Sequence, residues 1–116
     1  MRILIIDDNK DISSMYNQFL TLKGHQCVET NQGQNGIALI QKHEFDIVIL
    51  DLAMPEFDGF DVIDLLVAEK LLDNLRVIVI TASSINNEKI KKLKSQGVFE
   101  CLKKPINLQE LLIWIE

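Results

Sequence analysis

The chain has 116 residues, 47% of them hydrophobic and 25% charged, which is typical of one soluble globular domain. This composition excludes a disordered, collagen-like or fibrous chain. Twelve Lys and Arg against seventeen Asp and Glu give a formal charge of −5, which argues against direct binding of nucleic acid. The apolar runs are too short for a signal-peptide core or a membrane span. We therefore expect a cytoplasmic protein with one domain over residues 1–116, no second domain and no membrane contact.

The two cysteines, Cys27 and Cys101, are far apart in the sequence and lack the spacing of metal ligands. Isolated thiols of this kind are typical of a reducing compartment. We expect both to be small buried residues.

Three short runs of aliphatic residues predict buried β-strands over residues 3–6, 47–50 and 77–80. Each run is continuous rather than alternating, as expected of parallel strands that are covered on both faces. More polar stretches around Cys27 and Val28 and over residues 98–102 predict two further strands at the edges of the sheet.

Helical patterns of apolar residues separate the predicted strands. The first pattern places five apolar residues on one helix face: Ile12, Met15, Tyr16, Phe19 and Leu20. Weaker patterns follow over residues 37–40, 62–67, 90–93 and 108–115. Gly24 and Gly97 stand where the first and fourth helices should end in a left-handed cap, and Asn107 is the expected N-cap of the last helix.

This alternation predicts an α/β fold of five consecutive βα units. Strict alternation implies a parallel sheet with right-handed crossovers and helices on both faces. Ligands bind such sheets beyond the carboxyl ends of the strands. We therefore expect the functional residues at those strand ends.

Polar residues that can bind a metal or take part in a reaction stand at four of the five predicted strand ends. Asp7 and Asp8 end the first strand, Asp51 the third, and Thr81 the fourth, while Lys103 and Lys104 end the fifth. Like charges about 4 Å apart at an effective dielectric near 20 cost about 4 kcal/mol per pair. Three gathered carboxylates therefore need a compensating cation or raised pKa values.

Mg²⁺ is the natural cation for this set, because it accepts carboxylate and carbonyl oxygens, keeps several waters and also binds phosphate oxygens. A carboxylate beside it can act as a nucleophile toward phosphorus and form an aspartyl phosphate. Lys104 supplies positive charge for the phosphoryl oxygens, and Thr81 supplies a neutral donor. The pattern therefore indicates phosphoryl transfer to an aspartate.

These residues resemble the receiver domain of two-component response regulators, and the resemblance covers the whole chain. The motifs are IIDD over residues 5–8, DLAMPEFDG over 51–59, ITA over 80–82 and KKP over 103–105. Each motif alone is weak, but their order and their positions at strand ends make the set specific. The resemblance implies a flavodoxin-like (βα)5 doubly wound sheet of five parallel strands in the order 2-1-3-4-5.

The resemblance also implies the roles of the acidic residues. Asp51 is expected to be phosphorylated. Asp8 and Asp51 are expected to bind Mg²⁺ directly, or Mn²⁺ in its place, with Asp7 acting through a water and the backbone carbonyl of Ala53 completing the metal ligands.

The phosphoryl group is expected to contact Thr81, Ala82 and Lys104. We choose Lys104 over its solvated neighbour Lys103 because the family's active lysine directly precedes a proline. Pro105 is expected to follow a cis peptide bond. By the same resemblance the loop after Asp51 is shaped by residues 54–55 and by Asp58 and Gly59, of which Asp58 is the expected turn or cap residue.

Cys101 departs from the family pattern. The family commonly carries Tyr or Phe at this position, and that ring moves inward when the threonine approaches the phosphate. Cysteine is too small to act in this way, so the usual coupling of threonine and aromatic ring is in question. Phe99, two residues earlier on the same strand face, is a candidate substitute.

Several other residues have one or two possible roles. Ala53 and Ser83 flank the phosphoryl position and are both small, which leaves the phosphoryl lifetime open. Trp114 either faces a partner or packs against the preceding helix, and His25 and His43 are expected to be exposed loop or helix-end residues. The lysines of the fourth helix form a solvated face or recognise an acidic partner: Lys89, Lys91, Lys92 and Lys94.

The resemblance implies a signalling domain rather than an enzyme, with only self-catalysed phosphoryl transfer and autodephosphorylation. A histidine kinase or a phosphotransfer protein would deliver the phosphoryl group to Asp51 with Mg²⁺. The fourth helix, fifth strand and fifth helix would then change their affinity for a downstream protein, for an effector fused in a longer chain, or for a second copy.

Three alternative functions fit the residues less well. A phosphatase with an aspartyl nucleophile would need an acid two residues after it, where Ala53 stands. A flavin carrier would need a Ser/Thr/Gly-rich phosphate loop after the first strand, where residues 7–11 read DDNKD. A receiver-like scaffold that is not phosphorylated is favoured only by Cys101, because Asp7, Asp8, Asp51, Thr81 and Lys104 are all present.

Overall fold

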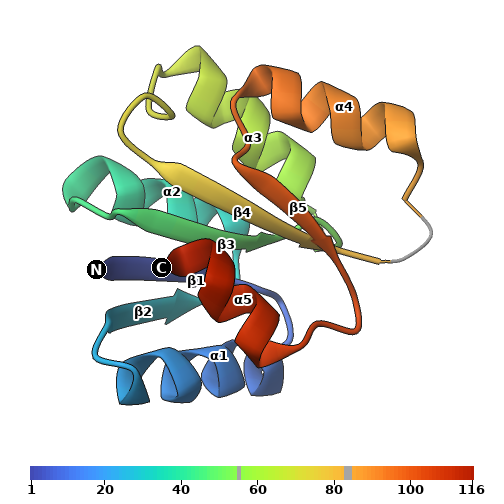
Figure 1. The fold of residues 1–116 in the computed structure, drawn as a ribbon. Coiled ribbons are helices and arrows are strands. Elements are labelled where there is room, and N and C mark those ends of the chain that lie inside the picture. The colour runs from blue at the N-terminus through green and yellow to red at the C-terminus, as the bar shows by residue number, and fades with distance from the viewer. Residues whose placement is uncertain (55, 83–84) are drawn as a thin grey trace.

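The computed structural model describes residues 1–54, 56–82 and 85–116, so the expectations for Pro55 and Ser83 lie outside the described residues. Five parallel strands form one sheet in the order β2-β1-β3-β4-β5, which confirms the predicted fold class (Figure 1). The strands are β1 (Arg2–Ile6), β2 (Gln26–Thr30), β3 (Ile47–Asp51), β4 (Arg76–Thr81) and β5 (Glu100–Lys103). The two weakly predicted strands are β2 and β5, and both lie at the edges as expected.

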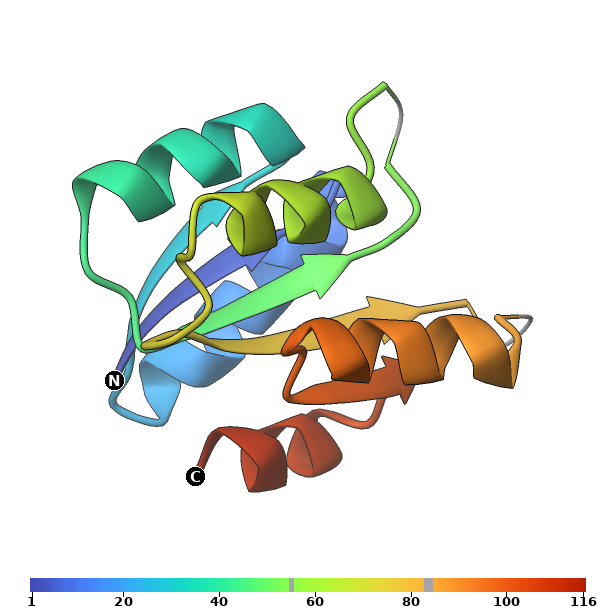
Figure 2. The same cartoon turned by 90° about the horizontal axis from the view of Figure 1, so that it is seen from above.

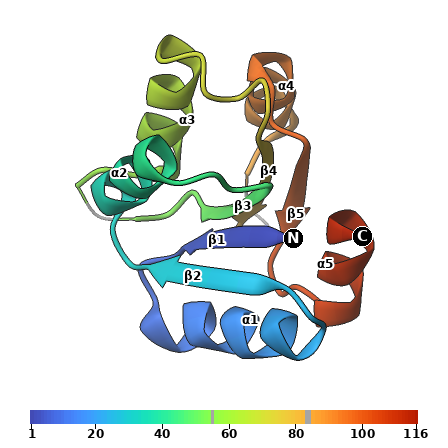
Figure 3. The same ribbon diagram turned by 90° about the vertical axis from the view of Figure 1, so that its left-hand side faces the viewer.

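Helices cover both faces of this sheet. They are α1 (Lys10–Leu22), α2 (Gly33–Lys42), α3 (Gly59–Ala68), α4 (Asn87–Gln96) and α5 (Leu108–Ile115). Figure 3 shows α1 and α5 on one face, and Figures 2 and 3 show α2, α3 and α4 together on the other. In the described part of the chain, none of these helices is long and apolar enough to cross a membrane.

The ends of the helices follow from short polar residues and glycine. Asn9, Asp58, Asn86 and Asn107 are N-caps whose side chains accept backbone N–H groups of the first turn. Gly97 ends α4 with φ 117°, a left-handed conformation that favours glycine. The predicted capping roles of Asn107 and Gly97 are thus confirmed.

The core forms two layers, one on each side of the sheet. Alternate residues of β1 enter different layers: Leu4 and Ile6 pack with α2, α3 and α4, whereas Ile3 and Ile5 pack with α1 and α5. All four are fully buried. This is why the central strands are continuously apolar, and why the exposed edge strands are not.

One prediction about histidine was wrong. His43 is exposed as expected, but the side chain of His25 is only 9% exposed. Its Nδ1 lies 3.3 Å from the amino group of Met1, and its Nε2 lies 3.4 Å from Oε2 of Glu116. The sequence pattern gave no sign that residues from the two ends of the chain contact His25; Figure 1 shows these two ends near each other.

Gly59 sets the close approach of α3 to the loop that follows β3. A Cβ atom at Gly59 would lie 2.6 Å from Cα of Leu52 and 2.7 Å from the carbonyl oxygen of Asp51. Both are backbone atoms at a strand end, which can move only if the strand end moves with them. The glycine is therefore needed to hold α3 against the end of β3.

We predict that Gly59→Ala lowers the free energy of unfolding by about 2 kcal/mol, because the overpacked backbone must shift. Gly36→Ala is the matched control, since its Cβ would press mainly on the end of the Ile6 side chain. Urea unfolding of both variants measures the difference. An equal or smaller loss for Gly59→Ala would contradict the role given to Gly59.

Candidate functional site

Asp7, Asp8 and Asp51 lie together at the carboxyl end of the central strands. Ile6 of β1 pairs with Leu50 of β3, so the residue that follows each of them reaches the same edge of the sheet. One carboxylate oxygen from each of the three aspartates lies within 4.8 Å of the others. Asp7 and Asp51 are 2% and 3% exposed, whereas Asp8 is open to solvent.

Lys104 is the cation that faces this acidic cluster. Its Nζ lies 3.5 Å from Oδ2 of Asp51 and 4.0 Å from Oδ2 of Asp7. Its backbone N–H donates to the carbonyl of Thr81 at 2.7 Å, and the Lys104–Pro105 peptide bond is cis. Of the two neighbouring lysines, only Lys104 lies within ion-pair distance of the cluster in the part of the chain that the structure describes.

The structure also brings Thr81, Ala82 and Ala53 to this edge. Thr81 is the last residue of β4, is 4% exposed, and follows Ile80, which pairs with Asp51. Ala82 comes next and is exposed. The N–H of Ala53 donates to Oδ1 of Asp51 at 3.1 Å, which fixes one oxygen and leaves Oδ2 on the side of Lys104.

Burial makes both inner carboxylates harder to ionise. Burial is the largest cause that raises the pKa of Asp7 to about 6; the charges of Asp51 and Asp8 raise it further, while a hydrogen bond from the Asn9 N–H and the charge of Lys104 oppose the rise. Burial likewise raises the pKa of Asp51, against the Ala53 N–H and Lys104. One lysine therefore does not compensate this acidic cluster.

The donor set fits a hard divalent cation such as Mg²⁺. Three carboxylates within reach of one point supply the oxygen ligands that this ion prefers, and their excess negative charge supplies the attraction. The exposed carboxylate of Asp8 leaves one side open to water. That is the arrangement Mg²⁺ requires, because it keeps part of its water shell.

Sequence reasoning missed two residues that hold this edge in place. The Nδ2 of Asn31, just after β2, donates to the carbonyl oxygen of Asp7 at 2.7 Å and to Oγ of Ser13 at 3.2 Å. The prediction took polar residues from the ends of four strands and left out the second strand. The same rule applied to all five strands would have found Asn31.

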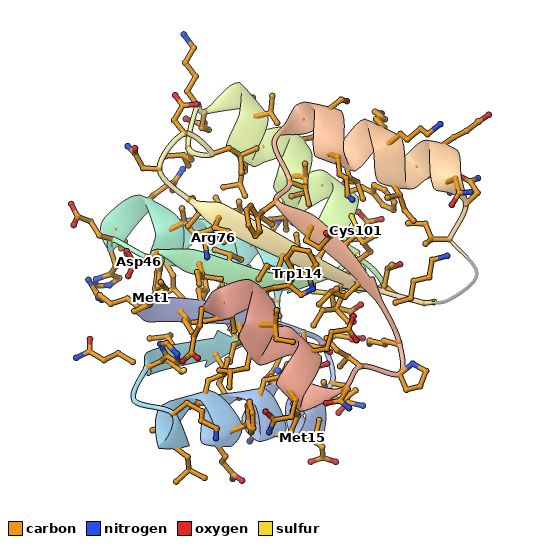
Figure 4. All side chains as sticks on the ribbon, in the orientation of Figure 1. Met1, Met15, Asp46, Arg76, Cys101 and Trp114 are labelled. Carbon is orange, nitrogen blue, oxygen red and sulfur yellow. The ribbon has the colours of Figure 1, made fainter. Side chains whose placement is uncertain are left out.

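The structure separates Phe99 from Cys101, which corrects the proposed substitution. Phe99 precedes β5 and packs at the other end of the strand, with its ring 6.1 Å from that of Trp114 and under the guanidinium of Arg76 at 4.6 Å. Cys101 packs against the core layer of α2, α3 and α4. Nη1 of Arg76 also donates to the carbonyl oxygen of Trp114 at 3.4 Å, and Figure 4 shows Trp114 between Arg76 and Cys101 in that view.

Trp114 and the two cysteines are all partly buried. Trp114 is half-buried against the core layer of α1 and α5, so it packs within the fold but not against the preceding helix α4, whose Leu93 belongs to the other layer. Cys27 and Cys101 are half-buried rather than fully buried. Burial raises the pKa of both thiols, which keeps them protonated near neutral pH.

The raised pKa of Asp7 predicts a specific dependence of stability on pH in metal-free buffer. Between pH 3.8, the ordinary pKa of an aspartate, and about pH 6, Asp7 stays protonated in the folded protein, whereas the unfolded chain has released this proton. The stabilisation that comes from the protonated Asp7 is therefore lost as pH rises through that window. An asparagine side chain at this position cannot ionise. We predict that Asp7→Asn gains about 2 kcal/mol of unfolding free energy relative to the unaltered protein between pH 4 and pH 7.

Urea unfolding with a chelator at several pH values measures this difference. The matched control is Asp73→Asn, which changes an exposed carboxylate and should follow the unaltered protein across the range. Parallel curves for Asp7→Asn and the unaltered protein would show that Asp7 ionises as easily in the fold as outside it.

Comparison with known proteins places the chain among signalling domains. The response regulator SaeR of Staphylococcus aureus (strain USA300) is 30% identical over 113 residues, which cover 97% of this chain and 48% of that protein. The chain thus spans about half the length of the curated relatives it matches.

Solved structures agree in fold. The chemotaxis response regulator CheY4 of Vibrio cholerae has a TM-score of 0.87 at 26% identity, covering 98% of this chain and 94% of that chain. The response regulator TrrA of Thermotoga maritima, solved in complex with Mg²⁺-BeF, has a TM-score of 0.82 at 25% identity, covering 98% and 95%. The family model of the response regulator receiver domain matches residues 3–116. The chain therefore belongs to the receiver domain family of two-component response regulators.

Proposed function

We propose that this receiver domain accepts a phosphoryl group on Asp51 from a histidine kinase or a phosphotransfer protein. The observation that supports the proposal is the placement of the Asp51 carboxylate. It ends β3 within the acidic cluster and lies 3.5 Å from Nζ of Lys104. A nucleophile for phosphorus needs this combination of a fixed oxygen and nearby positive charge.

The hydrogen bonds of Asp51 support its role as the nucleophile. The Ala53 N–H holds Oδ1, so Oδ2 is the oxygen available to attack phosphorus. As the new O–P bond forms, the bond between phosphorus and the donor's histidine nitrogen breaks, and the nitrogen keeps the electron pair. The reaction needs positioning and charge neutralisation more than acid–base help.

Asp8, Asp51 and the Ala53 carbonyl are the proposed direct ligands of Mg²⁺, with Asp7 acting through water and Mn²⁺ as a substitute. The burial of Asp7 and the exposure of Asp8 agree with this division. When bound, Mg²⁺ would supply positive charge to the phosphoryl oxygens and offset the repulsion among the carboxylates.

Lys104, Thr81 and Ala82 are the proposed contacts of the attached phosphoryl group. Phosphorylation adds nearly two negative charges beside Asp51. Lys104 would then bind a phosphoryl oxygen, and the Thr81 hydroxyl would donate to another. The Lys104 N–H and Thr81 carbonyl are already joined at 2.7 Å, so a movement of either strand end is passed to the other.

The proposed output is a changed surface of α4, β5 and α5. An ion pair of 2.9 Å between Nζ of Lys94 and Oε1 of Glu100 joins α4 to β5, so these two elements should respond together. The recipient would be a downstream protein, an effector in a longer chain, or a second copy. Cys101 cannot move as an aromatic ring does, so the response would pass through the packing of α4 on β5.

Receiver domains are signalling domains rather than enzymes in the usual sense. We propose that catalysis by this chain is limited to its own phosphorylation and to loss of the phosphoryl group by autodephosphorylation. Ala53, the small residue two positions after Asp51, neither blocks nor positions an attacking water.

The prediction that tests the proposal concerns the mass of the protein. After incubation with Mg²⁺ and a small acyl phosphate, we expect the intact mass to rise by one phosphoryl group, and we expect no rise for Asp51→Asn. Asp46→Asn is the matched control, because it changes an exposed aspartate at the opposite end of β3 and should label normally.

Two other outcomes would redirect the proposal. Persistent labelling of Asp51→Asn would move the nucleophile to another residue. No gain of mass in the unaltered protein, together with no NMR response to beryllofluoride, would favour a receiver-like scaffold that is not phosphorylated.

A further inference from the structure

In the part of the chain that the structure describes, no side chain holds the Asp8 carboxylate in one direction. Within residues 1–54, 56–82 and 85–116, no hydrogen bond or ion pair reaches the Asp8 carboxylate. The Asp7 and Asp51 carboxylates, by contrast, accept backbone N–H groups at 2.9 and 3.1 Å. The direction of Asp8 must therefore be set by its backbone.

The backbone of Asp8 is held through the peptide group that joins it to Asp7. The carbonyl oxygen of that group accepts the Asn31 amide at 2.7 Å, while the N–H of Asp7 donates to the Thr30 carbonyl at 3.2 Å. A peptide group is planar, so fixing its oxygen also fixes its N–H and the bond to the next Cα. Asn31 thereby helps to fix the position of the Asp8 Cα, from which the side chain leaves the chain.

Asn31 is itself held by a buried residue of α1. Its Nδ2 also donates to Oγ of Ser13, which is fully buried and donates in turn to the Lys10 carbonyl at 3.1 Å. These bonds join the end of β2 to the first turn of α1, and Asp8 lies in the short segment between β1 and α1. The amide therefore cannot turn away from the Asp7 carbonyl without breaking both of its bonds.

We infer that Asn31 is a positioning residue for the Mg²⁺ site, acting on Asp8 through the Asp7–Asp8 peptide group. The inference rests on the proposed function, in which Asp8 is a direct ligand of the ion. Residues that orient metal ligands typically change affinity by a factor of about 10 to 100 when removed. Loss of Asn31 should lower the affinity for Mg²⁺ more than it lowers the stability of the metal-free protein. This distinguishes Asn31 from a residue that only supports the fold.

The experiment is a calorimetric titration of the metal-free protein with MgCl₂ at pH 7. We expect Asn31→Ala to weaken Mg²⁺ binding about tenfold. Asn35→Ala is the matched control, because this exposed asparagine donates to Oε1 of Gln32 on its own helix end and should leave the affinity unchanged. Ser13→Ala keeps the bond to Asp7 but removes the support behind Asn31, so its affinity should fall by less.

A second measurement separates positioning from folding. In ¹⁵N NMR spectra without metal, Asn31→Ala should shift the Asp8 amide, while resonances of the distant β5 and α5 stay in place. Equal Mg²⁺ affinity in Asn31→Ala and the unaltered protein would overturn this inference alone. Absence of Mg²⁺ binding by the unaltered protein would overturn the proposed metal site and this inference with it.

Discussion

The crowding of three carboxylates at one edge of the sheet is the constraint on which the site depends. At about 4 Å and an effective dielectric near 20, one pair of like charges costs about 4 kcal/mol, which is a large fraction of the stability of a small domain. Two of the carboxylates are also buried, and burial raises the pKa of both. The features around the cluster, from Lys104 to the backbone N–H groups, act against this repulsion.

The fold holds the carboxylates in place because its centre is rigid. β1 and β3 are covered on both faces, and their apolar side chains in the two core layers are almost fully buried. Burial of this apolar surface is the main source of stability available to offset an unfavourable site. The cluster also begins where the strands end, so the strand register places Asp7 beside Asp51. A looser scaffold would let the like charges move apart.

Sequence patterns predicted the parts that depend on local chemistry. Continuous aliphatic runs predicted the three central strands, and polar residues at strand ends predicted Asp7, Asp8, Asp51 and Thr81, while the family resemblance chose Lys104 over Lys103. Long-range packing was harder to predict. The side chain of His25 is mostly covered where it contacts residues from the two chain ends, and Phe99 packs on Arg76 and Trp114 rather than beside Cys101. Asn31 was missed because the end of the second strand was not searched for polar residues, although Asn31 directly follows β2.

The most direct test of this account is the thermal unfolding midpoint at pH 7 in MgCl₂ and in NaCl of equal ionic strength. If the carboxylates form a site that needs a divalent cation, the midpoint should rise by several degrees with MgCl₂ and level off as the site fills, because the ion binds the folded chain alone. NaCl should have little effect. The same midpoint in both salts would contradict the account, since the carboxylates would then be compensated within the protein itself.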